Sequence, residues 1–341
     1  MTYAFERVDV RGDNWPIKID TDQARTIYQT PAWLAFLSRT QHGELVFGAL
    51  REGRETIGYF TGLIVRKLGL RILGSPFPGW STDYMGFTLS AGADRRQAVQ
   101  ALIGFAFQEL GCVHLEIMDR NLTVSDLGGL GVQHRVYRGF EIDLTRDEDE
   151  LFSNMTSACR RCVRKAEKEG VFIEEAHDRE FADEYYAQLK DVFAKQSLVP
   201  TYGIERVRQL ITHMHPTGHL LLLRARDRNG RCVATGIFPH MNGVMYFWGG
   251  ASWRHHQLLR PNEAIQSYAM KIGKQKGLRT YDMGGGGEYK RKYGGSEIEV
   301  PWFRKSKYPW IGYLREMAQQ SHKLSQHCRG RFNRLYAREG L

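Results

Sequence analysis

The sequence predicts an α/β protein built from two related modules, and three observations support this. The chain has 341 residues, about enough for two domains. Its 42% apolar, 25% charged and 12% aromatic residues are typical of a folded protein and exclude wholesale disorder. An order of hairpin, helix and strand also occurs twice along the chain. Together these features predict a duplicated α/β domain.

The first copy of this order begins within residues 44–61, where a polar turn separates two apolar stretches. Such a pattern is typical of a β-hairpin. Apolar residues at helical spacing then predict a helix that ends at Gly111. A short strand follows at residues 113–118.

The second copy begins with a hairpin at residues 218–240, and a third strand follows the turn signal at Asn242. A helix is predicted to begin after Pro261 and to end at Gly277. It leads into a strand at residues 278–283. The two copies are long enough to be two domains of one duplicated kind.

These patterns set the expected domain boundaries. We expect a first domain at residues 1–145, a second at residues 146–305 that carries the active site, and a C-terminal helix with a basic tail at residues 306–341. Between the modules, charged residues predict one helix from about Asp147 to Glu169, then a strand and more helix up to Pro200.

The C-terminal segment is predicted to be a helix that packs back on the body of the protein. One side of it carries apolar residues, namely Trp310, Ile311, Leu314 and Met317, and many basic residues follow.

The charge balance favours a polyanionic partner. Lys and Arg number 48 against 38 Asp and Glu, which gives a net charge of +10. Nucleic acid, phosphorylated ligands and anionic lipid surfaces are all attracted by such a surplus.

The expected location is the cytoplasm. No secretory signal is visible, and no apolar stretch is long enough to span a bilayer. The five cysteines are odd in number and scattered, which fits a reducing compartment. We therefore expect no integral membrane segment, and a peripheral membrane contact stays open.

The glycine-rich stretch at residues 281–295 is the first candidate site. Asp282 ends a strand, and four glycines follow at Gly284, Gly285, Gly286 and Gly287. Glycine backbones can form an anion-binding nest, and Lys290 and Lys292 lie alongside to neutralise a phosphate or a developing oxyanion. A flexible loop with solvated lysines is the alternative. The P-loop and dinucleotide-binding patterns are both absent, which excludes those two classes.

A basic helix at residues 157–170 is the second candidate. On a helix, Arg160, Arg164 and Lys168 form one row, and Arg161 with Lys165 forms another. This face would suit a polyanion, while a solvated helix is the alternative.

No metal site is predicted. Cys159 and Cys162 have the spacing of a zinc half-site, but no second such pair exists to complete it. The histidines at His213, His215 and His219 are separated by loop-forming residues. His255 and His256 are weak candidates for a general base.

At this point the sequence resembles a known family. The stretch RPNEAIQSYAMKIGKQKGLRTYDMGGGGEYKRKYGG resembles the closing half of the Fem family, the peptidoglycan-bridge aminoacyltransferases, and of their FemAB-like relatives in the GNAT acyltransferase superfamily. SACRRCVRKAEKEGV resembles the family's basic helix leading into its second domain. The resemblance implies two tandem GNAT-like domains, each with a mixed, mostly antiparallel sheet flanked by helices.

The resemblance also implies site residues. The family signature of aromatic-Lys-x-x-aromatic-Gly is similar to residues 289–294, with Tyr in place of the commoner Phe. By resemblance, Lys290 would bind the donor ester or its tetrahedral intermediate, and Tyr289 would form one wall of the site. Asp282 and the four glycines would form its floor. We further expect donor or acceptor contacts from Lys292, Tyr293, Arg160, Arg164, Tyr202, Trp248 and Asn262.

The implied reaction joins an activated acyl donor to an amine. CoA-dependent members place the pyrophosphate on a glycine-containing turn before a helix, whereas residues 254–261 contain no glycine. This favours aminoacyl-tRNA as the donor, and neither donor is a separate cofactor. The acceptor would be an amine-bearing glycan, lipid-linked or peptide molecule of the cell envelope, including peptidoglycan, or of a natural-product pathway. A CoA-dependent N-acyltransferase on a sugar or lipid amine and a non-catalytic RNA-binding protein stay open as alternatives.

Overall fold

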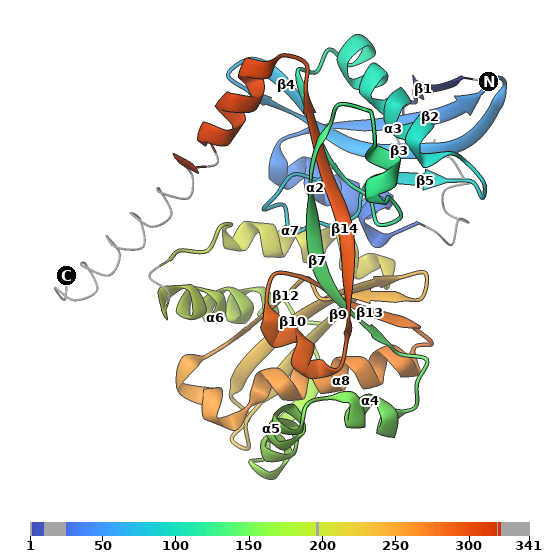
Figure 1. The fold of residues 1–341 in the computed structure, drawn as a ribbon. Helices are drawn as coiled ribbons and strands as arrows, with labels where there is room; N and C mark the ends of the chain where they lie inside the picture. The colour runs from blue at the N-terminus through green and yellow to red at the C-terminus, as the bar shows by residue number, and fades with distance from the viewer. Residues whose placement is uncertain (1, 10–24, 196–197, 319, 322–341) are drawn as a thin grey trace, which may run out of the picture. The chain divides into compact units, whose positions relative to one another are not determined.

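The structure is a computed structural model that describes residues 2–9, 25–195, 198–318 and 320–321. It divides into two compact units. Unit 1 comprises Met1–Arg138 and Glu299–Met317, and unit 2 comprises Gly139–Ile298 and Ala318–Leu341. Each unit contains a mostly antiparallel sheet with helices packed on it, which confirms the predicted α/β class (Figure 1).

Unit 1 has a sheet in the order β1-β2-β3-β4-β6-β14, in which only the β4–β6 pair is parallel. A short strand, β5, also pairs with β3. The strands are β1 (Tyr3–Arg7), β2 (Glu44–Glu52), β3 (Glu55–Lys67), β4 (Leu70–Ser75), β5 (Phe87–Leu89), β6 (His114–Met118) and β14 (Ser296–Ser306). The helices and helical turns are η1 (Ile27–Gln29), α2 (Pro31–Gln41), α3 (Arg95–Gly104), η2 (Phe105–Glu109) and η3 (Val124–Leu127).

Unit 2 has a sheet in the order β8-β9-β10-β11-β13-β7, in which only the β11–β13 pair is parallel. Here the short strand β12 pairs with β10. The strands are β7 (Gln133–Asp143), β8 (Phe172–Glu175), β9 (Leu220–Arg226), β10 (Cys232–Met241), β11 (Val244–Tyr246), β12 (Gly249–Ser252) and β13 (Thr280–Gly285). The helices and helical turns are α4 (Glu148–Asn154), α5 (Ser157–Lys168), α6 (Phe181–Lys195), α7 (Ile204–Met214), η4 (His215–Thr217), η5 (Arg254–Leu259), α8 (Pro261–Gln275) and η6 (Glu288–Tyr293).

The two units share one strand order, but each takes its last strand from the other half of the sequence. β7 follows β6 along the chain and pairs with β13, whereas β14 follows β13 and pairs with β6. The unit boundaries consequently fall within β7, after Arg138, and within β14, after Ile298. The predicted boundaries after residues 145 and 305 differ from these, because a repeat in the sequence does not say which sheet a final strand joins.

The charged helix expected from about Asp147 to Glu169 is two helices. Met155 adopts an extended conformation and ends α4, and the side chain of Thr156 then accepts a hydrogen bond from the Cys159 amide to cap α5. The amide of Thr156 donates to the carbonyl of Lys292 at 2.9 Å. This hydrogen bond, at the break between α4 and α5, therefore holds the start of α5 against η6.

The C-terminal segment is helical over residues 309–318, and the rest of the predicted tail, residues 322–341, lies outside the described residues. The expectation that one apolar side packs on the body is correct only for Ile311, which is 4% exposed. Trp310, Leu314 and Met317 are between 48% and 64% exposed. Among the described residues, no helix has the length and apolar character needed to cross a bilayer.

Candidate active site

A pocket of unit 2 opens where two neighbouring strands separate. β11 pairs with β13 as far as Tyr246 and Asp282, and the Phe247 amide still donates to the carbonyl of Asp282. The next amide, that of Trp248, donates instead to the carbonyl of Ile237 on β10. From there β12 pairs only with β10. The divergence of β12 from β13 leaves room for a ligand.

The pocket has a volume of about 210 Å³ and is lined by side chains from four parts of unit 2. The first part is α6 with β10, and the second is β12 with Phe247 of the link between β11 and β12. The third part is the start of α8 with the preceding turn, and the fourth is η6. The lining residues are Val192, Thr235, Phe247, Gly250, Ala251, Ser252, Gln257, Asn262, Glu263, Ile265, Gln266, Tyr289, Lys292 and Tyr293. Four of the predicted residues are thus brought together, namely Tyr289, Lys292, Tyr293 and Asn262.

An ion pair supplies the charge in this pocket. Lys292 Nζ lies 2.7 Å from Glu263 Oε1, and the two side chains are 31% and 12% exposed. An ammonium has three N–H donors, and a carboxylate accepts on two oxygens, so this contact leaves capacity on both groups. Glu263 was not predicted from the sequence. An acidic residue in the first turn of a helix is usually a partner for the helix dipole, and only the fold places this one opposite a lysine.

Several other polar side chains of the pocket are held by hydrogen bonds to neighbours. Asn262 Nδ2 donates to Ser252 Oγ at 2.9 Å, and Thr235 Oγ1 donates to Gln188 Oε1 at 2.8 Å. Tyr289 is 55% exposed, while Tyr293 is buried in the core and burial raises the pKa of its hydroxyl. Fixed donors and acceptors beside an open aromatic ring are the usual means by which a pocket orients a ligand.

Lys290 lies beside the pocket in η6, which directly follows the glycine loop of residues 283–287. Its side chain is buried, and Nζ donates to the carbonyls of Met283 and Gly285 at 2.6 and 2.7 Å. The ammonium also lies 5.7 Å from the centre of the Phe247 ring. These contacts let Lys290 hold the end of β13 against η6.

The glycines make that loop possible. Gly284, Gly286 and Gly287 have φ values of 67°, 73° and 152°, which side chains rarely allow. The loop can therefore turn sharply enough to aim two carbonyls at one ammonium. Asp282 is buried, and its Oδ1 accepts from the Gly284 amide at 2.7 Å. Asp282 and the four glycines do not line the pocket, and they shape the loop that carries η6.

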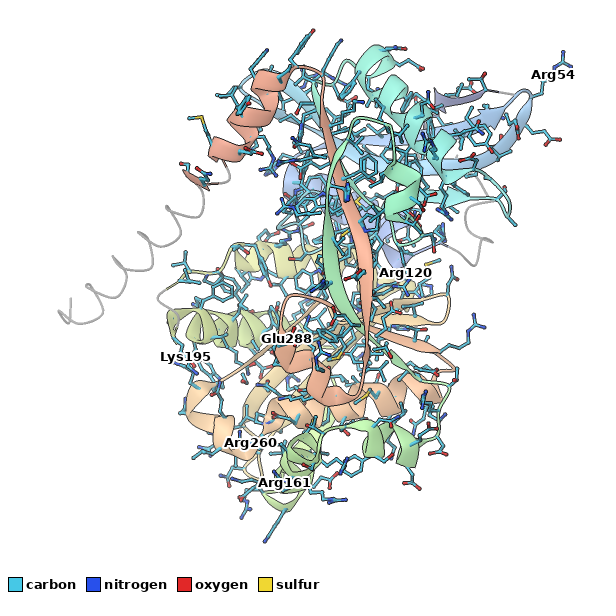
Figure 2. All side chains as sticks on the ribbon, viewed as in Figure 1. Arg54, Arg120, Arg161, Lys195, Arg260 and Glu288 are labelled. Carbon is cyan, nitrogen blue, oxygen red and sulfur yellow. The ribbon has the colours of Figure 1, made fainter. Side chains whose placement is uncertain are left out.

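The helix that carries the basic face, α5, begins next to Lys292, because the amide of Thr156 donates to the carbonyl of Lys292. Arg160 is half-buried, and its Nη1 donates to the carbonyls of Ser153 and Met155. The other basic residues of the face, namely Arg161, Arg164, Lys165 and Lys168, are exposed, and Figure 2 shows Arg161 at the surface.

Tyr202 and Trp248 lie in an aromatic cluster with Tyr185 and do not line the pocket. The hydroxyls of Tyr185 and Tyr202 are 3.0 Å apart, and the rings of Tyr202 and Trp248 are separated by 5.7 Å. Gly249 permits this packing, because a Cβ there would lie 2.4 Å from the hydroxyl of Tyr185.

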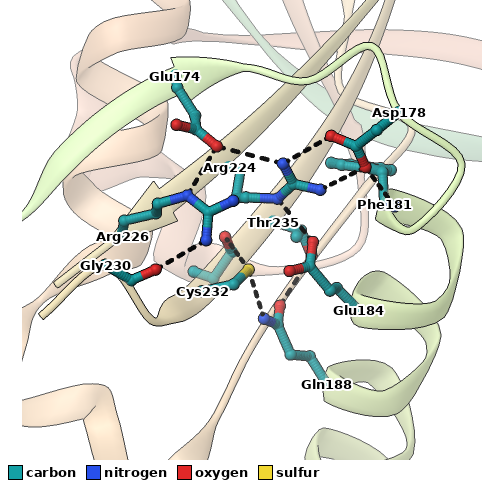
Figure 3. Close-up of polar contacts among 11 residues, drawn as sticks. Glu174, Asp178, Phe181, Glu184, Gln188, Arg224, Arg226, Gly230, Cys232 and Thr235 are labelled. Atoms are coloured by element: carbon teal, nitrogen blue, oxygen red, sulfur yellow. Dashed lines mark hydrogen bonds and ion pairs between the residues drawn. The ribbon is translucent and has the colours of Figure 1, made fainter.

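A buried arginine fixes α6 beside the pocket. Arg224 of β9 binds Asp178 through both of its terminal nitrogens, and it also contacts Glu174 and Glu184 (Figure 3). One turn beyond Glu184, Gln188 accepts from Thr235, and Val192 lines the pocket. The hydrogen bonds from Arg224, together with its charge, outweigh the effect of burial and lower the pKa of Asp178 from 3.8 to about 2.

We expect Arg224→Met to lower the free energy of unfolding at pH 7 by about 2–3 kcal/mol. This is less than is typical of a fully buried pair, because the carboxylates are partly exposed and would regain water. Asp178 stabilises the fold while it is ionised, above its unfolded pKa near 4, and that contribution is lost as the pH falls towards 2. The difference between wild type and variant should therefore shrink in acid.

Urea unfolding at pH 7, pH 4 and pH 2.5 measures this difference. Arg208→Met is a matched control, since Arg208 pairs with Asp183 on the surface. This substitution should lower the free energy of unfolding by less than about 1 kcal/mol. Equal losses for the two variants would contradict the assigned role of Arg224.

Other features of unit 2 do not suit the predicted chemistry. A larger pocket of about 420 Å³ lies among α4, α5 and α8, and none of the predicted site residues lines it. Within the described residues, no group of three or more His, Cys, Asp or Glu side chains is arranged to hold a metal ion. His256 lies outside both pockets.

Comparison with known proteins places this pocket in a familiar kind of domain. Residues 153–292, which include most of unit 2 and nearly all of the pocket, match the family model described as an acetyltransferase (GNAT) domain. This part of the chain is similar to a GNAT domain. A search of the curated proteins finds no match.

Solved structures show a similar fold over most of the chain. It is similar to FemX, with a TM-score of 0.69 and 15% identity over 87% of this chain and 96% of that one. It is also similar to L-PGS from Bacillus licheniformis, with a TM-score of 0.51 and 12% identity over 82% of this chain and 92% of that one. A tandem GNAT protein from the clavulanic acid biosynthesis pathway has a TM-score of 0.51 and 11% identity, over 90% of this chain and 99% of that one.

These findings confirm the predicted resemblance at the level of the GNAT domain and the tandem fold. Together with the family match they support an acyl-transferring enzyme in general. The donor, the acceptor and the roles of single residues are matters for proposal.

Proposed function

We propose that this GNAT domain catalyses amide formation, by transferring an aminoacyl group from aminoacyl-tRNA to an amine acceptor. The observation that carries the proposal is the Lys292–Glu263 pair in the pocket between β12 and η6. A volume of about 210 Å³ suits an amino-acid side chain and its ester.

The pocket residues have complementary roles in this reaction. The amine nitrogen attacks the ester carbonyl carbon, a C–N bond forms, and the C–O bond to the ribose breaks. Negative charge develops on the carbonyl oxygen, and the ammonium of Lys292 stabilises it. Glu263 accepts the proton that the amine gives up, and this proton goes on to the leaving ribose oxygen. No covalent enzyme intermediate is needed.

Lys290 and Asp282 act as positioning residues in this proposal. They hold the glycine loop, and the loop sets the distance between η6 and α8. The position of Lys292 opposite Glu263 depends on that distance. This role for Lys290 is an alternative to the direct contact with the donor that the family resemblance implies.

The start of α8 supports a donor other than CoA. A pyrophosphate bound at a helix N-terminus needs free amides and no negative charge. Here the first residue of α8 is Pro261, which has no amide hydrogen, and Glu263 places a carboxylate in the first turn. The exposed basic side chains of α5, which begins beside Lys292, suit the phosphates of an RNA instead.

For the acceptor we propose an amine of a cell-envelope precursor, with the reaction in the cytoplasm where charged tRNA is available. The support is the shared fold with FemX and L-PGS. An N-acyltransferase that uses CoA on a sugar or lipid amine is the second candidate, favoured by the description of the matched family model as an acetyltransferase.

Incubation with a mixture of labelled aminoacyl-tRNAs and acyl-CoAs tests the donor. We expect an aminoacyl-tRNA to be consumed and acetyl-CoA to bind more weakly than about 1 mM by titration calorimetry. Consumption of an acyl-CoA would contradict aminoacyl-tRNA as the donor but would still support acyl transfer. RNA binding without consumption of any donor would indicate a non-catalytic RNA-binding protein.

The basic face of α5 gives a second, independent measurement. Replacing Arg161 and Lys165 by Ser should weaken tRNA binding and reduce its salt dependence, because two phosphate contacts are lost. A variant with Arg54 and Lys195 replaced by Ser loses the same charge at exposed sites outside α5 and is the matched control. Equal effects of the two variants would contradict binding at α5.

A further inference from the structure

A groove of unit 2 among α4, α5 and α8 has no part in the proposed reaction (Figure 1). It has a volume of about 420 Å³, and its floor is formed by apolar side chains of the core, namely Leu151, Met155, Val163, Val171 and Met270. The half-buried rings of Phe152 and Tyr268 also line it. A concave apolar site of this volume suits a small ligand. We call it the α4–α8 groove.

Three exposed carboxylates line the edge of this groove. Glu148 and Asp149 belong to the first turn of α4, and Glu167 lies near the end of α5. Glu148 lies 3.8 Å from Lys271, the one basic side chain among the described residues that line the groove. The carboxylates of Asp149 and Glu167 form no ion pair or hydrogen bond within the described part of the chain. Two negative charges are therefore uncompensated at the groove, although the chain has a net charge of +10.

We propose that the α4–α8 groove binds a small amphiphilic amine. Its apolar chain or ring lies on the floor, and its ammonium faces Asp149 and Glu167. Burial of the apolar part supplies most of the affinity, while the two carboxylates select a cation over an anion. Arg164 of α5 lies 5.2 Å from the centre of the Phe152 ring but does not line the groove, and water and salt screen an exposed charge at such a site.

A small molecule fits the groove better than a protein partner does. A protein interface needs a wider apolar surface around its central pocket. The large apolar side chains that are exposed in the described part of unit 2 are Phe172, Leu258 and Tyr289, and none of them lines the groove. The apolar area is thus confined to the groove itself, as is typical of a small-molecule site.

The groove is separate from the candidate active site, because the two use different residues of α8. Ala264, Ser267 and Lys271 line the groove, whereas Glu263 and Gln266 line the pocket beside η6. No residue that lines the groove also lines that pocket. The amine is therefore bound away from the Lys292–Glu263 pair, and the inference does not depend on the proposed reaction.

Titration calorimetry of the full chain with three eight-carbon probes tests the inference. Octylammonium, 1-octanol and octanoate share one apolar chain and differ in charge. At pH 7 we expect octylammonium to bind about tenfold more tightly than 1-octanol, and octanoate to bind most weakly. Added salt should weaken the binding of octylammonium more than that of 1-octanol, because only the ion pairs are screened.

Variants locate the site. Asp149→Asn with Glu167→Gln should lower the affinity for octylammonium about tenfold, to that of 1-octanol, and leave the affinity for 1-octanol unchanged. Glu55→Gln with Glu109→Gln removes two exposed carboxylates of unit 1 and is the matched control. Ser267→Trp places a large ring in the groove and should weaken the binding of all three probes. Equal thermal unfolding midpoints of the variants and wild type show that the fold is kept.

Four results would overturn the inference. One is that no probe binds up to the limit of its solubility. Another is equal affinity of the wild type for octylammonium and octanoate. A third is an unchanged affinity for octylammonium when Asp149 and Glu167 are both replaced. The last is binding that Ser267→Trp leaves intact, which would place the ligand outside the groove.

Discussion

Glu263→Gln is expected to lower kcat/KM for amide formation by about 10²–10³, the usual contribution of a general base. A carboxamide does not accept the proton of the attacking amine at neutral pH. Its oxygen can still accept a hydrogen bond from Lys292, which lies 2.7 Å from Glu263 in the wild type. The fold and the shape of the pocket should therefore be kept. Single-turnover transfer from the donor that the wild type consumes measures this loss.

The control for this variant is Glu288→Gln. Glu288 also lies next to the signature residues of η6, but it is exposed, pairs with Arg291 and does not line the pocket. Its replacement should change kcat/KM less than about twofold. A loss below threefold for Glu263→Gln would exclude Glu263 as the base.

Lys292→Gln extends the same test. We expect kcat/KM to fall about 10–100-fold, because the positive charge that stabilises the developing oxyanion is missing. Because both side chains act on one reacting centre, the double variant should lose less than the product of the two single losses. Fully additive losses would indicate that the two residues act separately.

Lys290→Met is expected to lower both stability and activity. Two carbonyls of the glycine loop would lose their buried donor, which costs about 2–3 kcal/mol of unfolding free energy. The loop would then no longer place η6, and kcat/KM should fall at least about a hundredfold. Lys290→Arg should not restore activity, because a planar guanidinium does not reproduce the contacts of a compact ammonium.

This prediction separates two roles for Lys290. If the lysine holds the loop, denaturant midpoint and kcat/KM fall together. If it instead contacts the donor ester, as the family resemblance implies, kcat falls and stability is kept. Lys276→Met, an exposed lysine at the end of α8, is the control and should change neither quantity. An unchanged midpoint for Lys290→Met would contradict the role that we propose.

The sequence predicted much of the fold because local patterns repeat in it. Both hairpins, β2–β3 and β9–β10, follow from apolar stretches on either side of polar turns. α8 follows from Pro261 at its start and Gly277 after its end. Such signals depend on neighbours along the chain, so they can be read without tertiary contacts.

The candidate site could be predicted only in part. Tyr289, Lys292 and Tyr293 belong to one short segment, and its unusual composition marked it. Glu263 was missed, because an acidic residue in the first turn of a helix is ordinary. Tyr202 and Trp248 were expected near a ligand, whereas the structure packs them with Tyr185 outside the pocket.

The sequence by itself determined the fold class, the duplication and the segment that carries the family signature, because each is encoded in local order and spacing. Tertiary structure alone decided three further matters. It exchanged the last strands β7 and β14 between the units and placed Glu263 opposite Lys292. It also left Trp310, Leu314 and Met317 of the C-terminal helix exposed to the solvent. Each of these depends on contacts between residues far apart in the chain, and a hydrophobic or charged pattern does not identify its distant partner.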